Sequence, residues 1–451
     1  MTVRERNNAE QLAARDCDNC TETRIITDEL KHYQEEHERL CVLLNITREI
    51  STELQLDRLL FVIMDEVKNA LHADRCSVFL LDEEKNELWS KVAHGESEIR
   101  FASHLGIAGH VATTGEILNI PDAYADSRFN PEIDRQTGYK TQNMLTFPMR
   151  NRLNEIIGAF QVLNKKEGSF TRDDEELLNA ISTIAATQIE NAQLYEQLQN
   201  TLNSFIETLA STIDARDPLT AGHSKRIALY SNEVAKIIHL NEPRKKVLRF
   251  AALLHDYGKV SLSDAILKNH KKLTEKQYSQ MRSHPAITRA ILEKIQLSKE
   301  LKDLPFIAGT HHEKVDGTGY PEGLKLEQIP AEGRLLAVVD AFDAMTSNRY
   351  YTGRMSFEKV IRILEQDSGT HFDPAFVKAF KKLRLDKLVE ILENESAEWL
   401  DKTDLSKLSQ YTIDDLIFEL RFDTTRNNGF KLVDTFKKYY QQEYLKQKER
   451  G

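Results

Sequence analysis

The chain has 451 residues, of which 40% are hydrophobic and 29% are charged, and its formal net charge is −10. This length suits two or three domains, and the composition is ordinary for a globular protein. The acidic balance argues against nucleic-acid polymers as partners, because an acidic surface repels a polyanion. No apolar run reaches the ~18 residues that a membrane span needs, and the start, MTVRERNNAEQ, lacks the apolar core of a signal peptide.

The cysteine content favours a cytoplasmic protein, and the missing apolar run predicts no membrane span. The chain contains four cysteines, which are too few for a disulfide framework at this length. Cys17 and Cys20 form an isolated CDNC motif, whereas a zinc knuckle needs a second ligand pair, and none lies nearby. We interpret this motif as a solvated turn.

Residues 1–44 are expected to form a flexible N-terminal segment that continues into a helix. Residues 1–27 are polar and show no periodic pattern. From residue 30 onward a short heptad-like stripe follows, made of Leu30, Tyr33, His37, Leu40 and Leu44. This stripe is compatible with a dimer-forming coil.

Residues from about 45 to 180 have the pattern of an α/β domain. The stretch RCSVFLLDEE predicts a short strand, and NELWSKVAHG predicts its hairpin partner. The stretch TFPMRNRLNEIIGAFQVLNKK predicts two more strands around a polar turn. Apolar residues at three- and four-residue steps in LDRLLFVIMDEVKNALH predict a flanking helix.

A long helix is expected to leave this domain, because neither glycine nor proline occurs between Gly168 and Pro218. We place the linker helix at about residues 175–210. Five apolar residues fall on one of its faces: Leu194, Leu198, Leu202, Phe205 and Leu209. Such a helix either carries a signal by rotation or register change, or serves as a passive spacer with a dimer seam.

Residues 203–385 have a helical pattern with short loops. Within it, KKVLRFAALLHDYGKV predicts an apolar helix that ends at Gly258, since glycine is a natural helix stop. Residues 386–451 are helical and charged, and we assign them no role.

Several side chains that can bind metals occur in the helical region. His255 and Asp256 end the apolar helix, and Asp340 ends another apolar run. Burial of such charged groups is costly unless partners or a metal compensate. Each histidine taken alone is more simply a core or surface residue. The whole candidate ligand set is His223, His255, Asp256, His284, His311, His312 and Asp340.

These residues occur in motifs that resemble the HD-GYP family, a branch of the HD superfamily of metal-dependent phosphohydrolases. The matching motifs are DPLTAGHSKR, LLHDYGK, HP, HHEKVDGTGYP, DAFDAMTSNR and GTHFDP, in the family order. The resemblance implies an all-α domain that hydrolyses cyclic di-GMP to pGpG or GMP with bound iron or manganese. It implies the seven ligands above, with Asp256 bridging two metals. Mixed imidazole and carboxylate donors suit such ions.

The resemblance also implies roles around the metals. Lys259 would reach the reacting phosphate for charge stabilisation or proton transfer. In HHEKVDGTGYPEG, Gly317 and Gly319 permit a sharp loop close to a nucleotide, and Tyr320 offers an aromatic face to a guanine. The same reading gives His311 and His312 to different metals and lets Glu313 and Asp316 orient them. Arg349 matches a family arginine that grips a phosphate or guanine.

Two departures from the family pattern concern the substrate and the metals. The family has a basic residue where this chain has Thr352, which puts substrate affinity in doubt, and we consider Arg354 a substitute. Members with three metals carry a glutamate where this chain has Leu219, which cannot bind a metal. We therefore predict two divalent metal ions.

Residues 45–195 resemble GAF domains, small-molecule sensors with a central antiparallel sheet. The stretch GIAGHVATTGEILNIPDAYADSRFN carries the general likeness, with Gly106 and Gly109 at an expected helix start. A narrower signature of cyclic-nucleotide-binding GAF domains is matched by Asn164, Lys165, Phe170, Asp174 and Glu175. It implies bound cAMP or cGMP, with a Lys165–Asp174 ion pair that locks the pocket. A GAF domain that only dimerises is the alternative.

Together these observations predict a multidomain, cytoplasmic and homodimeric signalling enzyme. An α/β GAF domain is joined by a long helix to an all-α HD-GYP phosphodiesterase, and the substrate is cyclic di-GMP. One alternative is a catalytically weak scaffold that senses cyclic dinucleotides. Another is a phosphodiesterase for a different cyclic dinucleotide, such as cyclic GMP-AMP.

Overall fold

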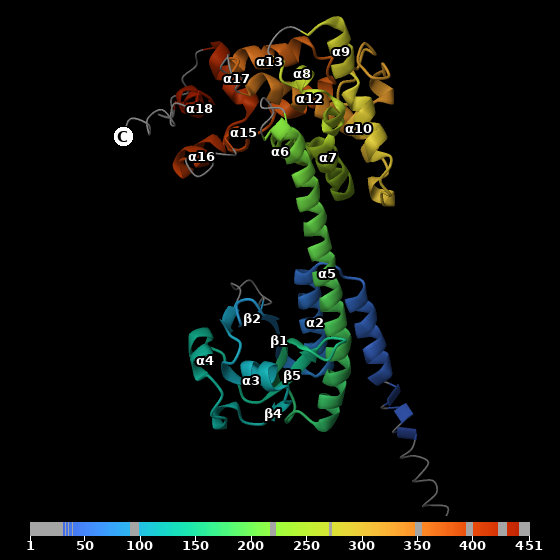
Figure 1. Ribbon diagram of the computed structural model, residues 1–451. Coiled ribbons are helices and arrows are strands. Elements are labelled where there is room, and N and C mark those ends of the chain that lie inside the picture. The colour runs from blue at the N-terminus through green and yellow to red at the C-terminus, as the bar shows by residue number, and fades with distance from the viewer. Residues whose placement is uncertain are drawn as a thin grey trace, which may run out of the picture. The chain divides into compact units, whose positions relative to one another are not determined.

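The computed structural model describes residues 30–31, 33–34, 36–37, 39–90, 99–216, 222–269, 273–347, 354–393, 400–422 and 431–441. The chain divides into two compact units, residues 1–200 and 201–451. The boundary lies within the long helix α5 (Arg172–Arg216). Figure 1 shows the strands in the first unit and the helices of the second.

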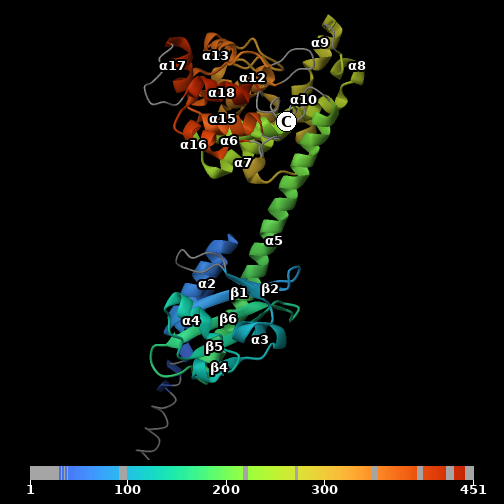
Figure 2. The same cartoon turned by 90° about the vertical axis from the view of Figure 1, so that its left-hand side faces the viewer.

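The first unit is built on a six-stranded antiparallel sheet with the order β3-β2-β1-β6-β5-β4. Figure 2 shows the strands β1, β6, β5 and β4 in this order. The strand pairing confirms the expected antiparallel sheet and the hairpin of the first two strands. The strands are β1 (Ala73–Asp82), β2 (Glu87–Ser90), β3 (Ile99–Ala102), β4 (Leu118–Ile120), β5 (Met144–Arg150) and β6 (Ile156–Lys165).

Helices cover both faces of this sheet because successive strand residues point to opposite sides. Val78 and Leu80 of β1 pack with α2 (Leu56–Ala70) and with the first part of α5 in one core. Phe79 faces the other side, where α3 (Gly106–Thr114) packs. The described part of this unit also contains η1 (Ala123–Ala125) and α4 (Pro131–Thr137).

A cavity of about 670 Å³ lies in the first unit beside β1. Phe79, Phe101 and Phe129 line it together with the cationic side chains of Lys68 and Arg75. The pairing of β2 with β1 covers only Leu80–Asp82. Earlier residues of β1, from Asp74 to Ser77, line the cavity.

The five signature residues brace the sheet rather than line this cavity. The expected ion pair between Lys165 and Asp174 is present. Asn164 binds the Tyr139 hydroxyl oxygen at 2.9 Å, and Glu175 accepts a hydrogen bond of 2.9 Å from Asn119. Tyr139 lines the cavity, so Asn164 acts on the cavity wall through that ring.

The N-terminal stripe lies on the exposed side of a helix. Leu30, Tyr33, Leu40 and Leu44 are all more than half exposed. Residues 39–51 are helical, and Ile46 and Ile50 on this helix pack into the core of the first unit. Cys17 and Cys20 lie outside the described residues.

The second unit is helical, as expected, and shares one hydrophobic core. Within it, Tyr230, Phe342 and Phe380 form a cluster of edge-to-face and tilted ring contacts. The helices that supply the core include α6 (His223–Ile237), α7 (Glu242–Leu254), α11 (Leu304–Gly309), α12 (Ala331–Thr346), α13 (Phe357–Gln366) and α14 (Pro374–Lys381).

The last helices belong to the same core as the residues before 385. The ring of Phe357 on α13 makes edge-to-face contacts with Phe436 and Tyr440, which lie on the last described helix. Arg354 binds Glu393 at 2.6 Å and the Tyr440 carbonyl oxygen at 3.0 Å. Arg354 is therefore used structurally, which contradicts its expected role as a substitute for a basic residue at position 352. These helices are α15 (Leu385–Leu392), α16 (Lys402–Leu408), α17 (Ile413–Phe422) and α18 (Leu432–Tyr440).

The apolar helix predicted to end at Gly258 ends earlier. Helix α7 stops at Leu254, and the 3₁₀ helix η2 (Tyr257–Ser261) contains Gly258. A Cβ atom at Gly258 would lie 2.1 Å from the His284 carbonyl oxygen. The glycine therefore serves a close backbone contact with α10 (His284–Leu292) instead of a helix stop.

The short helices of this unit complete the second domain. They are α8 (Asp264–Leu267), α9 (Glu275–Met281), η3 (Lys299–Leu301) and η4 (Leu326–Gln328). In the part of the chain that the structure describes, no helix has both the length and the apolarity to cross a membrane.

Candidate metal centre

Most of the predicted ligands lie at or just beyond helix ends that converge in the second unit. His223 is the first residue of α6, His255 follows the last residue of α7, and His284 begins α10. His311 and His312 follow α11 in a turn. Asp256 follows His255, and Asp340 lies within α12.

These side chains form two adjoining groups of potential metal ligands. One group is His284, His311 and His312, and the other is His223, His255 and Asp256. Within each group the ligand atoms lie within 4.8 Å of one another. Asp340 joins the second group, since its Oδ1 lies 3.2 Å from Nε2 of His223.

Three of the histidines are locked in one tautomer by backbone carbonyls. Nδ1 of His255, His284 and His311 lies 2.7, 2.7 and 2.8 Å from the carbonyl oxygen three residues earlier. A carbonyl only accepts hydrogen bonds, so each Nδ1 carries the proton and donates it. The nitrogen left to bind a metal in each ring is therefore Nε2.

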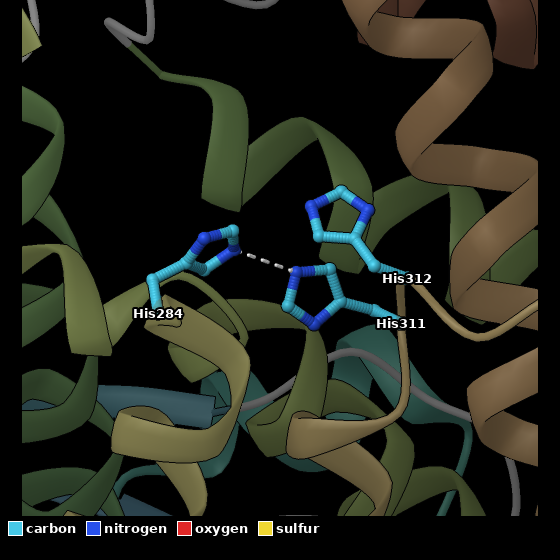
Figure 3. Close-up of side chains that lie close together, drawn as sticks. All are labelled: His284, His311 and His312. Carbon is cyan, nitrogen blue, oxygen red and sulfur yellow. Dashed lines mark hydrogen bonds between the residues drawn. The ribbon is translucent and has the colours of Figure 1, made fainter. Parts of the chain in front are cut away.

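These Nε2 atoms point at one another. Nε2 of His284 and Nε2 of His311 are 3.2 Å apart, as the dashed line in Figure 3 shows. The His312 ring lies beside them, 4.2 Å from the His311 ring between centroids. Nε2 of His255 is buried and, among the described residues, has no hydrogen-bond partner. Convergent acceptors need a cation between them.

Asp256 lies between the two groups and offers one oxygen to each. Its Oδ1 is 3.0 Å from Nε2 of His284 and 3.9 Å from Nε2 of His311. Its Oδ2 is 3.5 Å from Nε2 of His255 and 4.0 Å from Nε2 of His223. This geometry is what a carboxylate needs to bridge two cations.

Two hydrogen bonds of the Thr288 side chain hold the two groups together. Thr288 of α10 accepts a hydrogen bond of 2.8 Å from the Gly258 N–H and donates one of 2.9 Å to the His255 carbonyl oxygen. With the glycine contact to His284, it fastens the segment of His255 and Asp256 to α10.

His223 is oriented by a buried acid that the sequence analysis missed. Oδ2 of Asp343 lies 2.8 Å from Nδ1 of His223. Asp343 also receives two hydrogen bonds from Arg226, of 2.7 and 2.9 Å. Asp343 follows Asp340 by three positions on α12, and Arg226 follows His223 by three on α6, so a search for i,i+3 neighbours of the ligands would find both.

The protonation states favour metal binding. Burial lowers the pKa of His255, of His311 and, to about 4, of His312, so these rings are neutral. Burial raises the pKa of Asp256, but the charge of Lys259 is the largest opposing cause, and the pKa lies well below the usual range. Asp256 is therefore ionised.

His223 is the exception among these rings. Burial lowers its pKa, but hydrogen bonds with Asp340 and Asp343 outweigh burial and raise the pKa to about 10. A ligating imidazole is neutral, so a metal at Nε2 would replace the proton that His223 shares with Asp340.

Lys259 and the glycine-rich loop border this cluster. Nζ of Lys259 lies 2.6 Å from Oδ2 of Asp256. The Tyr320 ring packs against the His312 ring at 4.9 Å, and the guanidinium of Arg282 lies 4.5 Å from the Tyr320 centroid. A Cβ atom at Gly319 would lie 2.3 Å from the backbone nitrogen of Lys314, so this position requires glycine. Gly317 has a φ of +83°.

Two expectations for this loop were wrong. Glu313 is buried and accepts hydrogen bonds from the N–H groups of residues 322–324, at 2.7, 3.2 and 2.9 Å. Asp316 accepts hydrogen bonds from Thr318. Both acids therefore shape the loop instead of orienting a histidine. The ligand atoms of His311 and His312 lie within 4.8 Å of each other and of that of His284, and the expectation that the two rings bind different metals stays a prediction.

Arg349, Thr352 and Leu219 lie outside the described residues. The seven predicted ligands and Lys259 are brought together around Asp256. Neutral imidazoles and ionised carboxylates are a donor set that iron, manganese or zinc accepts, and the orphaned Nε2 of His255 fits the same need. The described residues thus suit divalent metal ions.

Comparison with known families agrees with this architecture. Residues 207–376 match the HD domain family, and residues 55–189 match the GAF domain family. The N-terminal fold is also similar to the crystal structure of the GAF domain from an Acinetobacter phosphoenolpyruvate-protein phosphotransferase. That likeness has 22% identity and a TM-score of 0.31, and it covers 36% of this chain and 98% of that one.

Two curated relatives are similar over part of the chain. A Vibrio cholerae protein named 3'3'-cGAMP-specific phosphodiesterase 3 is 38% identical over 181 residues, which is 40% of this chain and 39% of the relative. A Thermotoga maritima protein named cyclic di-GMP phosphodiesterase is 36% identical over 196 residues, which is 42% of this chain and 52% of the relative. The chain thus spans only 39% and 52% of the length of these relatives.

We predict that Asp343→Asn weakens metal binding by about 10- to 100-fold, because His223 loses the charge that orients its ring. Titration of the metal-free protein with Mn²⁺ measures the affinity. Asp386→Asn is the matched control, since Asp386 is also buried and bound twice by an arginine, at 3.0 and 2.5 Å from Arg384. Equal Mn²⁺ affinity in both variants would contradict the assignment.

Proposed function

We propose that this chain, which carries a GAF domain and an HD domain, is a metal-dependent phosphodiesterase of the HD-GYP type. It would hydrolyse cyclic di-GMP to pGpG, to GMP, or to both. The observation that carries the proposal is the position of Asp256, with one carboxylate oxygen toward each of two groups of histidines. A phosphodiester anion is the kind of substrate that such a cationic site would bind.

We propose two divalent ions, iron or manganese, held by His223, His255, Asp256 and Asp340 on one side and by Asp256, His284, His311 and His312 on the other. Such ions supply Lewis-acid charge to the phosphodiester and lower the pKa of a bound water. The two ligand groups and the single carboxylate between them support this number. The same interpretation follows from Leu219, which offers no further ligand.

The chain's own residues would bind and orient the substrate. Nζ of Lys259, held at 2.6 Å from Asp256, would meet a phosphoryl oxygen and can pass a proton to the leaving ribose oxygen. The Glu313 carboxylate fixes the glycine-rich loop, so the backbone at Gly317 and Gly319 and the ring of Tyr320 would hold the nucleotide. Arg349 would grip a phosphate or a guanine.

A second candidate substrate is 3'3'-cGAMP. The relative from Vibrio cholerae carries the name of a phosphodiesterase specific for 3'3'-cGAMP, whereas the relative from Thermotoga maritima carries that of a cyclic di-GMP phosphodiesterase. Both compounds are cyclic dinucleotides with at least one guanine. Direct competition between them identifies the preferred substrate.

We propose that the GAF domain binds cAMP or cGMP and thereby regulates the enzyme. The cavity of about 670 Å³ combines aromatic walls with cations, which suits a base and a phosphate. Among the cations that line it, Lys68 is bonded to Asp65 at 2.6 Å, and Arg100 to Asp82 at 3.2 Å. Arg75 instead stacks on Tyr139, with 3.8 Å between its guanidinium carbon and the ring centroid.

We further propose a cytoplasmic homodimer. Leu194, Leu198 and Phe205 are 56%, 64% and 60% exposed and follow one face of α5, whereas Leu202 and Leu209 pack against the core of the second unit. An exposed apolar stripe at heptad spacing supports pairing with the same helix of a second copy. A cytoplasmic location accords with Cys41 and Cys76, which are free thiols.

Hydrolysis is the first test. Protein purified without oxygen and loaded with Fe²⁺ or Mn²⁺ should hydrolyse cyclic di-GMP, and metal analysis should find two ions per chain. His255→Ala/Asp256→Ala should lose turnover by ~100-fold or more, because both ligand groups are damaged. Asp386→Asn should retain wild-type turnover. Bound dinucleotide without turnover in the wild type would favour the scaffold alternative, and three ions per chain would refute the two-metal site.

Ligand binding by the GAF domain is tested by calorimetric titration of the full chain with cAMP and with cGMP. Arg75→Gln should weaken binding by about 10-fold, because it removes a phosphate-binding cation. Lys166→Gln is the control, since Lys166 is exposed and does not line the cavity. If neither nucleotide gives a heat of binding with the wild type, the proposal that the GAF domain binds cAMP or cGMP is rejected.

Dimer formation is tested by light scattering after size-exclusion chromatography. Leu198→Glu/Phe205→Glu should convert a dimer to a monomer, because it places charges in the apolar stripe. Glu196→Lys, a charge change at another exposed position of α5, should leave the dimer intact. A wild-type chain that elutes as a monomer would contradict the proposal.

A further inference from the structure

The last turn of α5 is fastened to the segment that carries His223. Asp214 of α5 is buried, and its Oδ1 accepts a hydrogen bond of 2.8 Å from the hydroxyl of Ser224. Its Oδ2 accepts a second bond of 3.3 Å from the backbone N–H of Ser224. Ser224 follows His223 directly, in the first turn of α6. The carboxylate therefore anchors the backbone next to a predicted metal ligand.

The same turn of α5 is also fastened to the segment that carries Lys259. Nη1 of Arg216 donates to the carbonyl oxygen of Val260 at 2.8 Å, and Nη2 donates to that of Leu262 at 3.1 Å. Nη2 also lies 3.0 Å from Oδ1 of Asp264. Val260 follows Lys259 directly in η2. The planar guanidinium thus spans the chain just after the lysine.

We infer that Asp214 and Arg216 are positioning residues that hold His223 and Lys259 in register with each other. The inference rests on the proposed function, because it concerns the same metal centre. Asp343 fixes the rotation of the His223 ring, whereas Asp214 fixes the place of its backbone. The two acids act at different atoms, and their effects are separable.

Both anchors lie on α5, which also carries part of the GAF signature, so they can link the state of this helix to the metal centre. Helix α5 begins at Arg172 and contains Asp174 and Glu175 of the GAF signature in its first turn. Asp214 and Arg216 lie two residues apart at its other end. A shift or rotation of that end would move the backbone beside His223 and the backbone beside Lys259 together. Metal binding and phosphate contact would then change with the state of α5.

Loss of the two anchors should change two different properties, the Mn²⁺ affinity and kcat. Loss of the Asp214 anchor acts on a metal ligand, so Asp214→Asn should weaken Mn²⁺ binding by about 10-fold. Loss of the Arg216 anchor acts beside Lys259, so Arg216→Gln should leave Mn²⁺ affinity within about two-fold and reduce kcat by about 10-fold with little change in KM. Arg216→Lys, which keeps one charged donor, should recover part of kcat.

The experiment compares these variants of the full chain in Mn²⁺ titration, in steady-state hydrolysis of cyclic di-GMP and in thermal unfolding. Ser224→Ala accompanies Asp214→Asn, because it removes one bond with little change of volume and tests the anchor if Asp214→Asn does not fold. Glu207→Gln is the matched control. It removes an exposed ion pair of 2.6 Å between α5 and Arg249 of α7.

The positioning role is supported if Asp214→Asn and Ser224→Ala lose Mn²⁺ affinity while Glu207→Gln does not, at similar unfolding temperatures. It is overturned if Asp214→Asn and Ser224→Ala match Glu207→Gln in Mn²⁺ affinity, if Arg216→Gln matches Glu207→Gln in kcat, or if the anchor variants lose only thermal stability. A wild type that binds Mn²⁺ but hydrolyses no cyclic dinucleotide rejects the proposed function, and the metal titration still decides on Asp214. A wild type that binds no Mn²⁺ rejects both.

Discussion

The architecture of the second unit depends on how one buried carboxylate is shared. Asp256 turns one oxygen toward His284 and His311 and the other toward His255 and His223. The ionised carboxylate in this buried position is stabilised by the Lys259 ammonium, whose Nζ lies 2.6 Å from its Oδ2. Asp256 is met by these histidines because α6, α7, α10 and the turn after α11 converge on it.

Helix ends supply most of this chemistry, for a simple physical reason. The last carbonyls of a helix lack intrahelical partners, and a histidine just beyond can satisfy one of them with its Nδ1–H. His255, His284 and His311 all do so. The bond that completes a helix end therefore also determines which ring nitrogen is left for a metal. Structural stability and ligand preparation are here one interaction.

Sequence alone predicted the α/β and helical units, the antiparallel sheet, the Lys165–Asp174 pair and the set of side chains that meets around Asp256. It did so because residue type and motif order carry that information. It did not reveal the contacts of Asp343 with His223 and Arg226, or those of Arg216 with the segment after Lys259, since these join residues far apart in the chain. The Asp214–Ser224 contact joins residues closer in the chain but on two different helices, so no periodic pattern records it. The end of α7 was predicted at the wrong residue for a similar reason. Gly258 is required by a backbone contact with α10, which no local sequence pattern shows.

That glycine has a consequence for how this centre can vary. Gly258, two residues after Asp256, contacts the His284 carbonyl because it has no side chain of its own. The Thr288 hydroxyl accepts a hydrogen bond from the Gly258 N–H and donates one to the His255 carbonyl oxygen. The separation of the two ligand groups is thus set by main chain against main chain. A side chain at position 258, or loss of the Thr288 hydroxyl, would therefore disturb the spacing of the two ligand groups, although neither residue is a predicted ligand. Two residues that offer no atom to a cation thus help to determine where the cations can be held.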